Sequence, residues 1–140
     1  MIRGDQLMIG DWVIVDGTPR KVEAITKKKI GYHRKENEPR LYYARLHDVE
    51  PIEITEEFLF NHGFKVNRKY KIYEWKERLY GYMGQTLSVT TPISLQFEPQ
   101  MKFWGIDNPH TGFEWRGHFE YVHEFQHIVK SCDINFEIKM

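Results

Sequence analysis

Gly117–Lys130, with the sequence GHFEYVHEFQHIVK, is the most clearly helical segment of the chain. At about 100° per residue its apolar side chains gather on one stripe of the helix, which predicts that this stripe lies on an antiparallel sheet. The same segment contains His123-Glu124-Phe125-Gln126-His127, which matches the H-E-x-x-H pattern of zinc peptidases. The apolar stripe consists of Phe119, Val122, Phe125, Val129 and Cys132.

In a zinc peptidase the H-E-x-x-H spacing places two imidazoles one helical turn apart and a glutamate beside the metal-bound water. In this helix His123 and His127 project away from the apolar stripe, and Glu124 lies on the flank of the same polar side. We therefore expect these residues in solvent, with no cofactor and no catalytic role. The alternative is a small zinc peptidase with His123 and His127 as metal ligands and Glu124 as the catalytic residue. A third ligand would have to come from Asp107, His110, His118 or Asp133.

Length and composition restrict the classes of protein to consider. The 140 residues suffice for one ordinary domain or two very small ones. Because 20 basic and 20 acidic residues cancel, net charge alone does not hold the protein to nucleic acid or to an anionic membrane. The single cysteine, Cys132, excludes an intramolecular disulfide, and its place on the apolar stripe predicts a buried thiol. No apolar run has the length of a signal-peptide core or a membrane span, so we expect a cytoplasmic protein without a membrane partner.

Residues 1–54 are expected to form a first domain of short strands. The strand Leu7–Val15 enters a turn at Asp16-Gly17-Thr18-Pro19, where glycine and proline favour a bend. Five short strands in about fifty residues, opening on Ile-Gly-Asp-x-Val, are typical of a small SH3-like barrel. The four later strands are predicted at Lys21–Ile25, Ile30–His33, Arg40–Leu46 and Val49–Ile54.

Residues 55–140 are expected to form an antiparallel sheet with a short linking helix at about 55–62 and the main helix at about 118–131. Thr55 can cap the short helix and Gly63 can end it. Pro92 lacks a backbone donor, which predicts a break, a bulge or an edge position in its strand. The strands are predicted at Tyr70–Trp75, Leu79–Met83, Leu87–Phe97, Met101–Ile106, Phe113–Arg116 and Ile134–Ile138. The fold class is therefore α+β, mainly antiparallel β, with an SH3-like barrel followed by a sheet packed with one long helix.

A basic cluster in the first domain has two interpretations. It can form a rim that binds single-stranded nucleic acid, with tyrosines such as Tyr32, Tyr42 and Tyr43 as stacking platforms. It can also be a solvated hairpin tip, because three adjacent lysines are ordinary in a chain with 29% charged residues. The nucleic-acid interpretation assigns binding to Lys27, Lys28, Lys29, Arg34, Lys35 and Tyr32.

Three further segments carry a resemblance to known proteins. They are Ile9-Gly10-Asp11-Trp12-Val13, Ile54-Thr55-Glu56-Glu57-Phe58-Leu59 with Gly63-Phe64, and Tyr121-Val122-His123-Glu124-Phe125-Gln126. In this order they resemble a group of small proteins encoded in gut Bacteroidetes genomes and in their prophages or other mobile elements. That group has no established activity, so the resemblance implies a mobile-element accessory protein and no particular chemistry. Tyr121, Val122, His123 and Gln126 match the group's pattern, whereas Glu124 and His127 depart from it, which speaks against a zinc site.

Together these observations favour a non-enzymatic interaction module of a prophage or mobile element. The expected partner is a protein. Single-stranded nucleic-acid binding through the basic rim and a zinc peptidase at residues 123–127 are the two alternatives.

Overall fold

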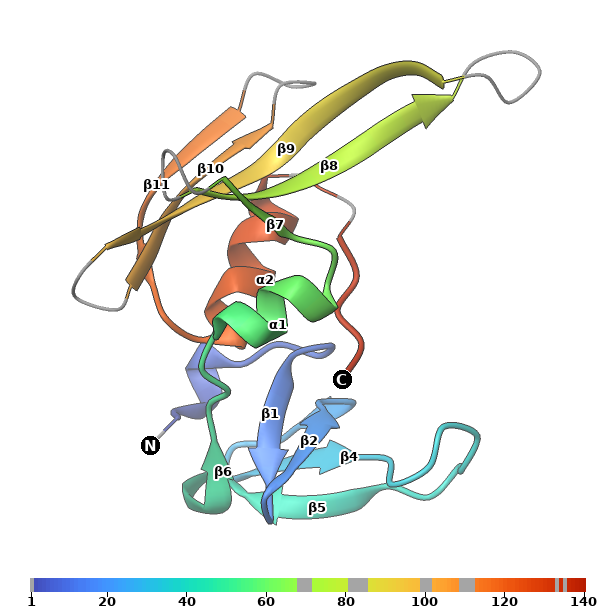
Figure 1. The fold of residues 1–140 in the computed structure, drawn as a ribbon. Helices are drawn as coiled ribbons and strands as arrows, with labels where there is room; N and C mark the ends of the chain where they lie inside the picture. Colours follow the sequence, from blue (N-terminus) through green and yellow to red (C-terminus); the bar gives the residue numbers. More distant parts are fainter. Residues whose placement is uncertain are drawn as a thin grey trace. The chain divides into compact units, whose positions relative to one another are not determined.

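The computed structural model describes residues 2–67, 72–80, 86–98, 102–108, 113–132, 134 and 136–140. These residues have an α+β fold in which antiparallel sheets accompany helices, the longest of which is α2 (Val122–Ser131) (Figure 1). The chain divides into two compact units. The first unit comprises Met1–Glu53, Tyr121–Gln126 and Lys139–Met140, and the second comprises Ile54–Glu120 and His127–Ile138.

The first unit contains two three-stranded antiparallel sheets, in the orders β2-β1-β6 and β3-β4-β5. Both sheets contribute side chains to one apolar core, and the strand pairs of the described residues do not close into a ring. The core consists of Ile2, Leu7, Val13, Val15, Val22, Ile30, Tyr32 and Val49. The elements are η1 (Gly4–Gln6), β1 (Trp12–Val15), β2 (Thr18–Lys21), β3 (Ala24–Ile25), β4 (Lys29–Tyr32), β5 (Tyr42–Arg45), η2 (Leu46–Asp48) and β6 (Val49–Glu50).

The chain enters β1 through a turn at residues 8–11 that contains Gly10, so only the second half of the strand predicted over Leu7–Val15 forms, at Trp12–Val15. The backbone N–H of Asp11 donates to the Met8 carbonyl at 3.1 Å, and the Asp11 carboxylate accepts from the Met8 N–H at 2.8 Å. Gly10, the third residue of the turn, has a φ of 98°, a value that residues with a side chain rarely adopt. The turn therefore requires this glycine, and it places the Asp11 side chain in the interior, 3% exposed.

The hairpin between β1 and β2 turns through Asp16-Gly17 alone, since Val15 pairs with Thr18. Both turn residues have positive φ values, 50° and 75°, as in the type I′ turns that Asp-Gly favours. The returning strand therefore begins at Thr18, whereas the sequence pattern predicted its start at Lys21. It includes Pro19, which is tolerated because β2 lies at the edge of its sheet.

The second unit is built on a five-stranded antiparallel sheet in the order β11-β10-β9-β8-β7, with helical segments on one of its faces (Figure 1). The prediction of two separate strands at Tyr70–Trp75 and Leu79–Met83, with a turn at residues 76–78 between them, is wrong because β8 continues through these residues. Their sequence, Lys-Glu-Arg, has charge but none of the glycine, proline or asparagine that would favour a turn. The elements are α1 (Glu56–Asn61), β7 (Lys65–Asn67), β8 (Ile72–Tyr80), β9 (Thr86–Glu98), β10 (Lys102–Asn108) and β11 (Phe113–Phe119), and α2 contributes residues to both units.

Two local expectations for this unit are confirmed. The side chain of Thr55 caps α1, since its Oγ1 accepts from the Phe58 N–H at 3.1 Å, and Gly63 follows the helix with a φ of 86°. Trp75 of β8 pairs with Ile93 of β9, and Glu77 pairs with Thr90. Between these two pairs β8 has one residue and β9 has two, one of which is Pro92, and this extra residue is a β-bulge. A bulge was one of the three outcomes that the missing proline N–H predicted.

The main helix begins at Val122, later than the predicted start at about 118. The reason is that β11 continues to Phe119 and that Tyr121 forms a bridge with Glu53. The Glu124 carboxylate accepts from the Tyr121 N–H at 3.1 Å, which satisfies a backbone donor at the helix start in the manner of a capping box.

The predicted final strand at residues 134–138 does not form among the described residues of the tail. The tail is irregular, yet Ile134 and Ile138 are buried and Phe136 packs edge-on against Trp75, with ring centroids 5.1 Å apart. The period of two in this part of the sequence therefore reflects alternate burial of side chains in an irregular segment and not a β-strand. None of the helices in the described part of the chain is long and apolar enough to cross a membrane.

Candidate anion-binding site

The tip of the β3–β4 hairpin carries the three lysines. Across this tip the Thr26 N–H donates to the Lys29 carbonyl at 2.8 Å, and the Thr26 hydroxyl accepts from the Lys29 N–H at 3.0 Å. The Leu46 N–H donates to the Lys28 carbonyl at 2.9 Å, which fixes the tip against the start of η2. The sequence Thr-Lys-Lys-Lys therefore forms a tight turn that holds its lysines beside residues 45–47.

A pocket of about 560 Å³ lies between this turn and η2. Lys29 and Arg45 face each other directly across β4 and β5, so both cations are held by paired strands. The pocket is lined by Lys27, Lys28, Lys29, Arg45, Leu46 and His47. Four cationic side chains and a histidine around one hollow create a positive potential that favours anions.

Neighbouring carboxylates do not neutralise these cations. Ion pairs among the described residues include Arg3–Asp5 and His47–Asp48, each at 3.5 Å, and neither of these includes a pocket lysine or Arg45. The local sequence has the same bias, since residues 24–47 contain seven lysines and arginines but only two glutamates. A protein with no net charge thus concentrates positive charge at this site.

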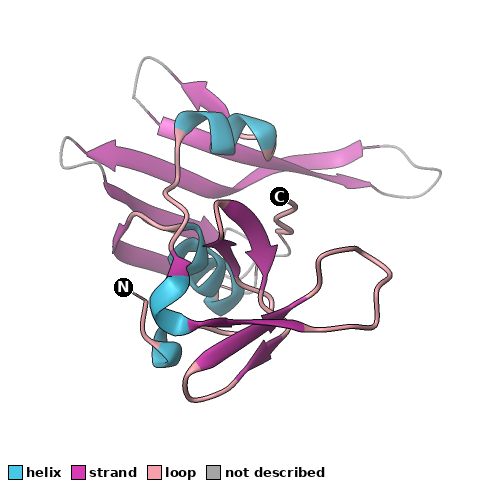
Figure 2. Cartoon of the chain, turned by 90° about the horizontal axis from the view of Figure 1, so that it is seen from below, coloured by secondary structure: helices cyan, strands magenta, loops and turns pink. Residues whose placement is uncertain are grey.

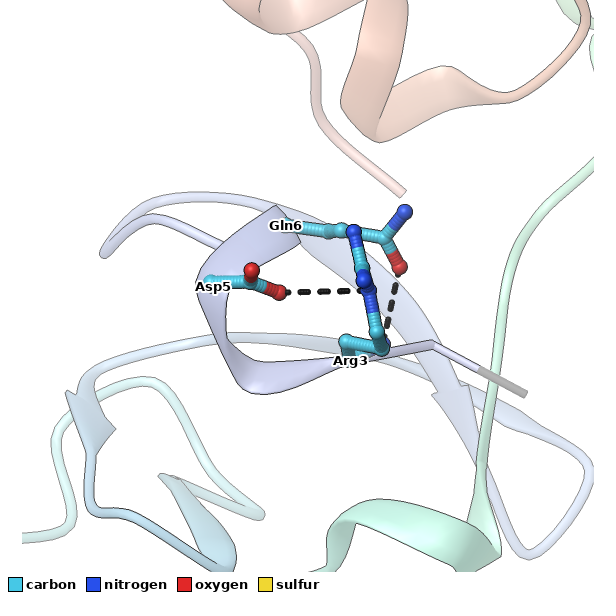
Figure 3. Close-up of polar contacts among 3 residues, drawn as sticks. All are labelled: Arg3, Asp5 and Gln6. Carbon is cyan, nitrogen blue, oxygen red and sulfur yellow. Dashed lines mark hydrogen bonds and ion pairs between the residues drawn. The ribbon is translucent and has the colours of Figure 1, made fainter.

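The N-terminal turn η1 packs beside the pocket wall. A Cβ on Gly4 would lie 3.1 Å from Leu46 Cδ1 and 3.9 Å from the Lys27 carbonyl oxygen, so a glycine here permits the close approach. Figure 3 shows the side chain of Arg3 beside Asp5, and the Arg3 N–H donates to Gln6 Oε1 at 2.8 Å. Because Asp5 balances Arg3, η1 adds shape to the pocket wall and little charge.

The other residues of the predicted nucleic-acid surface do not join the pocket. The β4–β5 ladder begins with the pair Lys29–Arg45, beside the pocket, and ends with the pair Tyr32–Tyr42. Arg34 and Lys35 come after this far end, in the loop that extends beyond β4 and β5 (Figures 1 and 2). There the guanidinium carbon of Arg34 lies 4.1 Å from the centre of the Tyr42 ring. The predicted set of six residues therefore divides, and only Lys27, Lys28 and Lys29 line the pocket.

Tyr32 is not a stacking platform, which corrects the sequence interpretation. Its side chain is 4% exposed and belongs to the core of the first unit. The period of two explains the error, because Ile30 faces the core and Tyr32, two residues on, must face the same way. The pocket residues Arg45 and His47 were missed, since only the register of β4 against β5 brings them to Lys29.

The H-E-x-x-H segment does not lie in solvent as expected. His123 is 6% exposed and its ring stacks on Tyr121, with centroids 5.9 Å apart and an interplanar angle of 11°. His127 and Glu124 are half-buried. The expectation assumed that one face of the helix is covered, but residues 121–126 belong to the first unit and 127–131 to the second.

No described group of three or more His, Cys, Asp or Glu side chains could hold a metal ion. Of the proposed third ligands, His110 and Asp133 lie outside the described residues, as do the side chains of Asp107 and His118. Cys132 is 1% exposed, which confirms its predicted burial, and this burial raises the pKa of its thiol. The thiol is therefore held in its protonated, weakly nucleophilic form.

Gln126 joins two of the three segments that carry the resemblance. Its Nε2 donates to the Gly10 carbonyl at 3.0 Å, and its Oε1 accepts from the Trp12 N–H at 2.9 Å. Both backbone groups flank the buried Asp11. The Tyr-Val-His-x-x-Gln segment thus has a structural role in holding the entry to β1.

No family model, no curated protein and no solved structure matches the chain.

Proposed function

We propose that the protein is a non-enzymatic binding module whose first unit takes a phosphate-bearing polyanion in the pocket beside η2. The observation that carries this proposal is the convergence of Lys27, Lys28, Lys29 and Arg45 on one hollow, without carboxylate partners among the described residues. An anion that enters the pocket replaces no existing ion pair of these four side chains. Binding therefore gains the Coulomb energy directly.

The exposure of these side chains indicates a ligand with several charges. All four cations are exposed, and an exposed ion pair contributes only about 0.2–1 kcal/mol. A single small anion would bind too weakly, whereas a ligand with successive phosphates adds several such contacts. Neutral replacement of the three lysines should cost about 2 kcal/mol in total, or roughly 30-fold in affinity.

The proposal extends to the type of fold and to the origin of the protein. Two three-stranded sheets with short strands around one core support an SH3-like barrel as the first unit. The three quoted segments support an accessory protein of a prophage or mobile element. In such a barrel the binding residues lie in turns at the ends of strands, as the lysines of the β3–β4 turn do.

Binding of inorganic polyphosphate, measured by calorimetric titration, tests the proposal. The Lys27→Gln/Lys28→Gln/Lys29→Gln variant should lose about 30-fold in affinity, and wild-type binding should weaken as salt rises from about 50 to 200 mM. The matched control is Lys21→Gln/Lys35→Gln/Lys65→Gln, which removes three exposed lysines outside the pocket. An equal loss in both variants, or no binding by the wild type, would show that the pocket is not the site.

A further inference from the structure

The outer face of the β3–β4–β5 sheet carries an exposed tyrosine next to the pocket. Ile30 and Tyr32 face the core, so Lys29 and Gly31 face the opposite side of β4. Gly31 pairs with Ala24 on β3 and with Tyr43 on β5, and these three residues form one row across the sheet. Tyr43 is 54% exposed, although large apolar side chains of the first unit are mostly in its core.

The glycine in this row determines where the Tyr43 ring lies. A Cβ on Gly31 would be 3.1 Å from Cε1 and 3.6 Å from Cδ1 of Tyr43, and 3.1 Å from the Cβ of Ala24. One edge of the ring therefore lies across the glycine, against the sheet. The exposed remainder of the ring presents an aromatic surface to solvent, of the kind that nucleobases stack on.

Two cations occupy the neighbouring row of the same face. Lys29 and Arg45 are paired with each other, two residues along β4 and β5 from Gly31 and Tyr43. At about 3.3 Å per residue the two rows are about 7 Å apart. Lys29 and Arg45 also line the pocket, so the ring, the paired cations and the lysine turn follow one another in space.

We infer that the ligand of this pocket is a single-stranded nucleic acid, with one base stacked on Tyr43 and the adjoining phosphates bound by Lys29, Arg45 and the lysine turn. This inference rests on the proposed polyanion-binding function and names its ligand. An exposed aromatic ring beside unpaired cations matches a polymer with an unpaired base next to each phosphate. Polyphosphate and acidic peptides have no such base, and a duplex hides its bases in the stack.

The binding of fluorescent oligothymidylate of about ten nucleotides, measured by anisotropy, tests the inference. The comparison ligand is an abasic oligonucleotide of equal length, which keeps the phosphates and lacks the bases. Tyr43→Ala should weaken oligothymidylate binding by about 5- to 100-fold and leave the affinity for the abasic strand and for polyphosphate unchanged. Tyr43→Phe, which keeps the ring, should bind oligothymidylate as the wild type does.

The lysine variant separates this inference from the function on which it rests. Lys27→Gln/Lys28→Gln/Lys29→Gln should weaken the binding of all three ligands and lower the slope of log affinity against log salt by about 2 for oligothymidylate. If the lysine variant loses affinity but Tyr43→Ala does not, the ligand is a polyanion without a stacked base and the inference is wrong. Tighter binding of a duplex, or displacement of oligothymidylate by polyglutamate as readily as by polyphosphate, would also overturn it. If the lysine variant keeps its affinity for polyphosphate, the proposed function itself fails.

Discussion

Gln126 shows how a single side chain near the end of the chain completes a turn near its start. Its amide provides one donor, to the Gly10 carbonyl, and one acceptor, for the Trp12 N–H. A carboxylate could supply only the acceptor, and an apolar side chain neither. Both backbone groups are part-buried, so they cannot exchange the lost bonds for water without cost.

Gln126→Ala should therefore lower the free energy of unfolding by about 1–3 kcal/mol. The measurement is urea denaturation followed by tryptophan fluorescence, with Trp12 adjacent to the change. The control is Gln6→Ala, because Gln6 Oε1 also accepts a backbone N–H, that of Arg3, but in an exposed turn (Figure 3). Gln6→Ala should cost below about 1 kcal/mol. Equal losses in the two variants would mean that the bonds of Gln126 contribute no more than an exposed turn contact.

Among the secondary-structure elements, α1 depends most on its ends. A helix of six residues, Glu56–Asn61, is too short to be stable alone, so its capping residues and its packing hold it. Thr55 caps the start, and at the other end the Gly63 N–H donates to the Phe60 carbonyl at 3.2 Å. Gly63 has the positive φ that this C-terminal geometry needs.

Gly63→Ala should lower the free energy of unfolding by about 1–2 kcal/mol, because a Cβ is strained at positive φ. Space is not the cause, since this Cβ would lie at an ordinary 3.6 Å from Trp75 Cδ1. Gly63→Asn is the matched variant, because asparagine adopts the left-handed conformation more readily, and it should lose less. Thermal unfolding of both variants checks this prediction. A smaller loss for alanine than for asparagine would indicate that contacts with Trp75 decide the outcome.

At the scale of the whole molecule, neither unit is one continuous stretch of chain. Residues 121–126 belong to the first unit, where the Val122 N–H donates to the Ile52 carbonyl at 2.8 Å and Tyr121 bridges Glu53. The predicted first domain, residues 1–54, lacks this segment. A chain of that length buries too little surface to replace the missing contacts easily.

A fragment of residues 1–54 should thus be less stable than the same residues in the intact protein. The bonds from Val122 and Gln126 contribute about 1 kcal/mol each, which predicts a loss of at least about 3 kcal/mol. Hydrogen exchange at the most protected amides of β1 and β2 measures it, since these strands pair with each other within the fragment. Fusion of residues 119–132 to the fragment through a glycine-serine linker should restore protection. Full protection in the fragment alone would show that the N-terminal segment is sufficient.

Local chemistry in the sequence was enough to locate several features of the fold and of the site. Thr55 and Gly63 delimit α1 because capping and positive φ depend on residue type alone. The alternation of residues 87–97 predicted β9, and the missing N–H of Pro92 predicted its irregularity. The run of lysines at 27–29 marked the hairpin tip that lines the pocket. Each of these features is encoded within a few residues of sequence.

The sequence by itself thus determined the α+β class, the capped helix and the basic turn, because periodicity, capping and charge are local properties. Only the tertiary structure decided which cations meet in the pocket, because Arg45 reaches Lys29 through the register of two strands. It also decided that His123 is buried, because residues 121–126 return to the first unit. A pattern in sequence shows which side chains share a face, whereas what covers that face depends on segments far away along the chain.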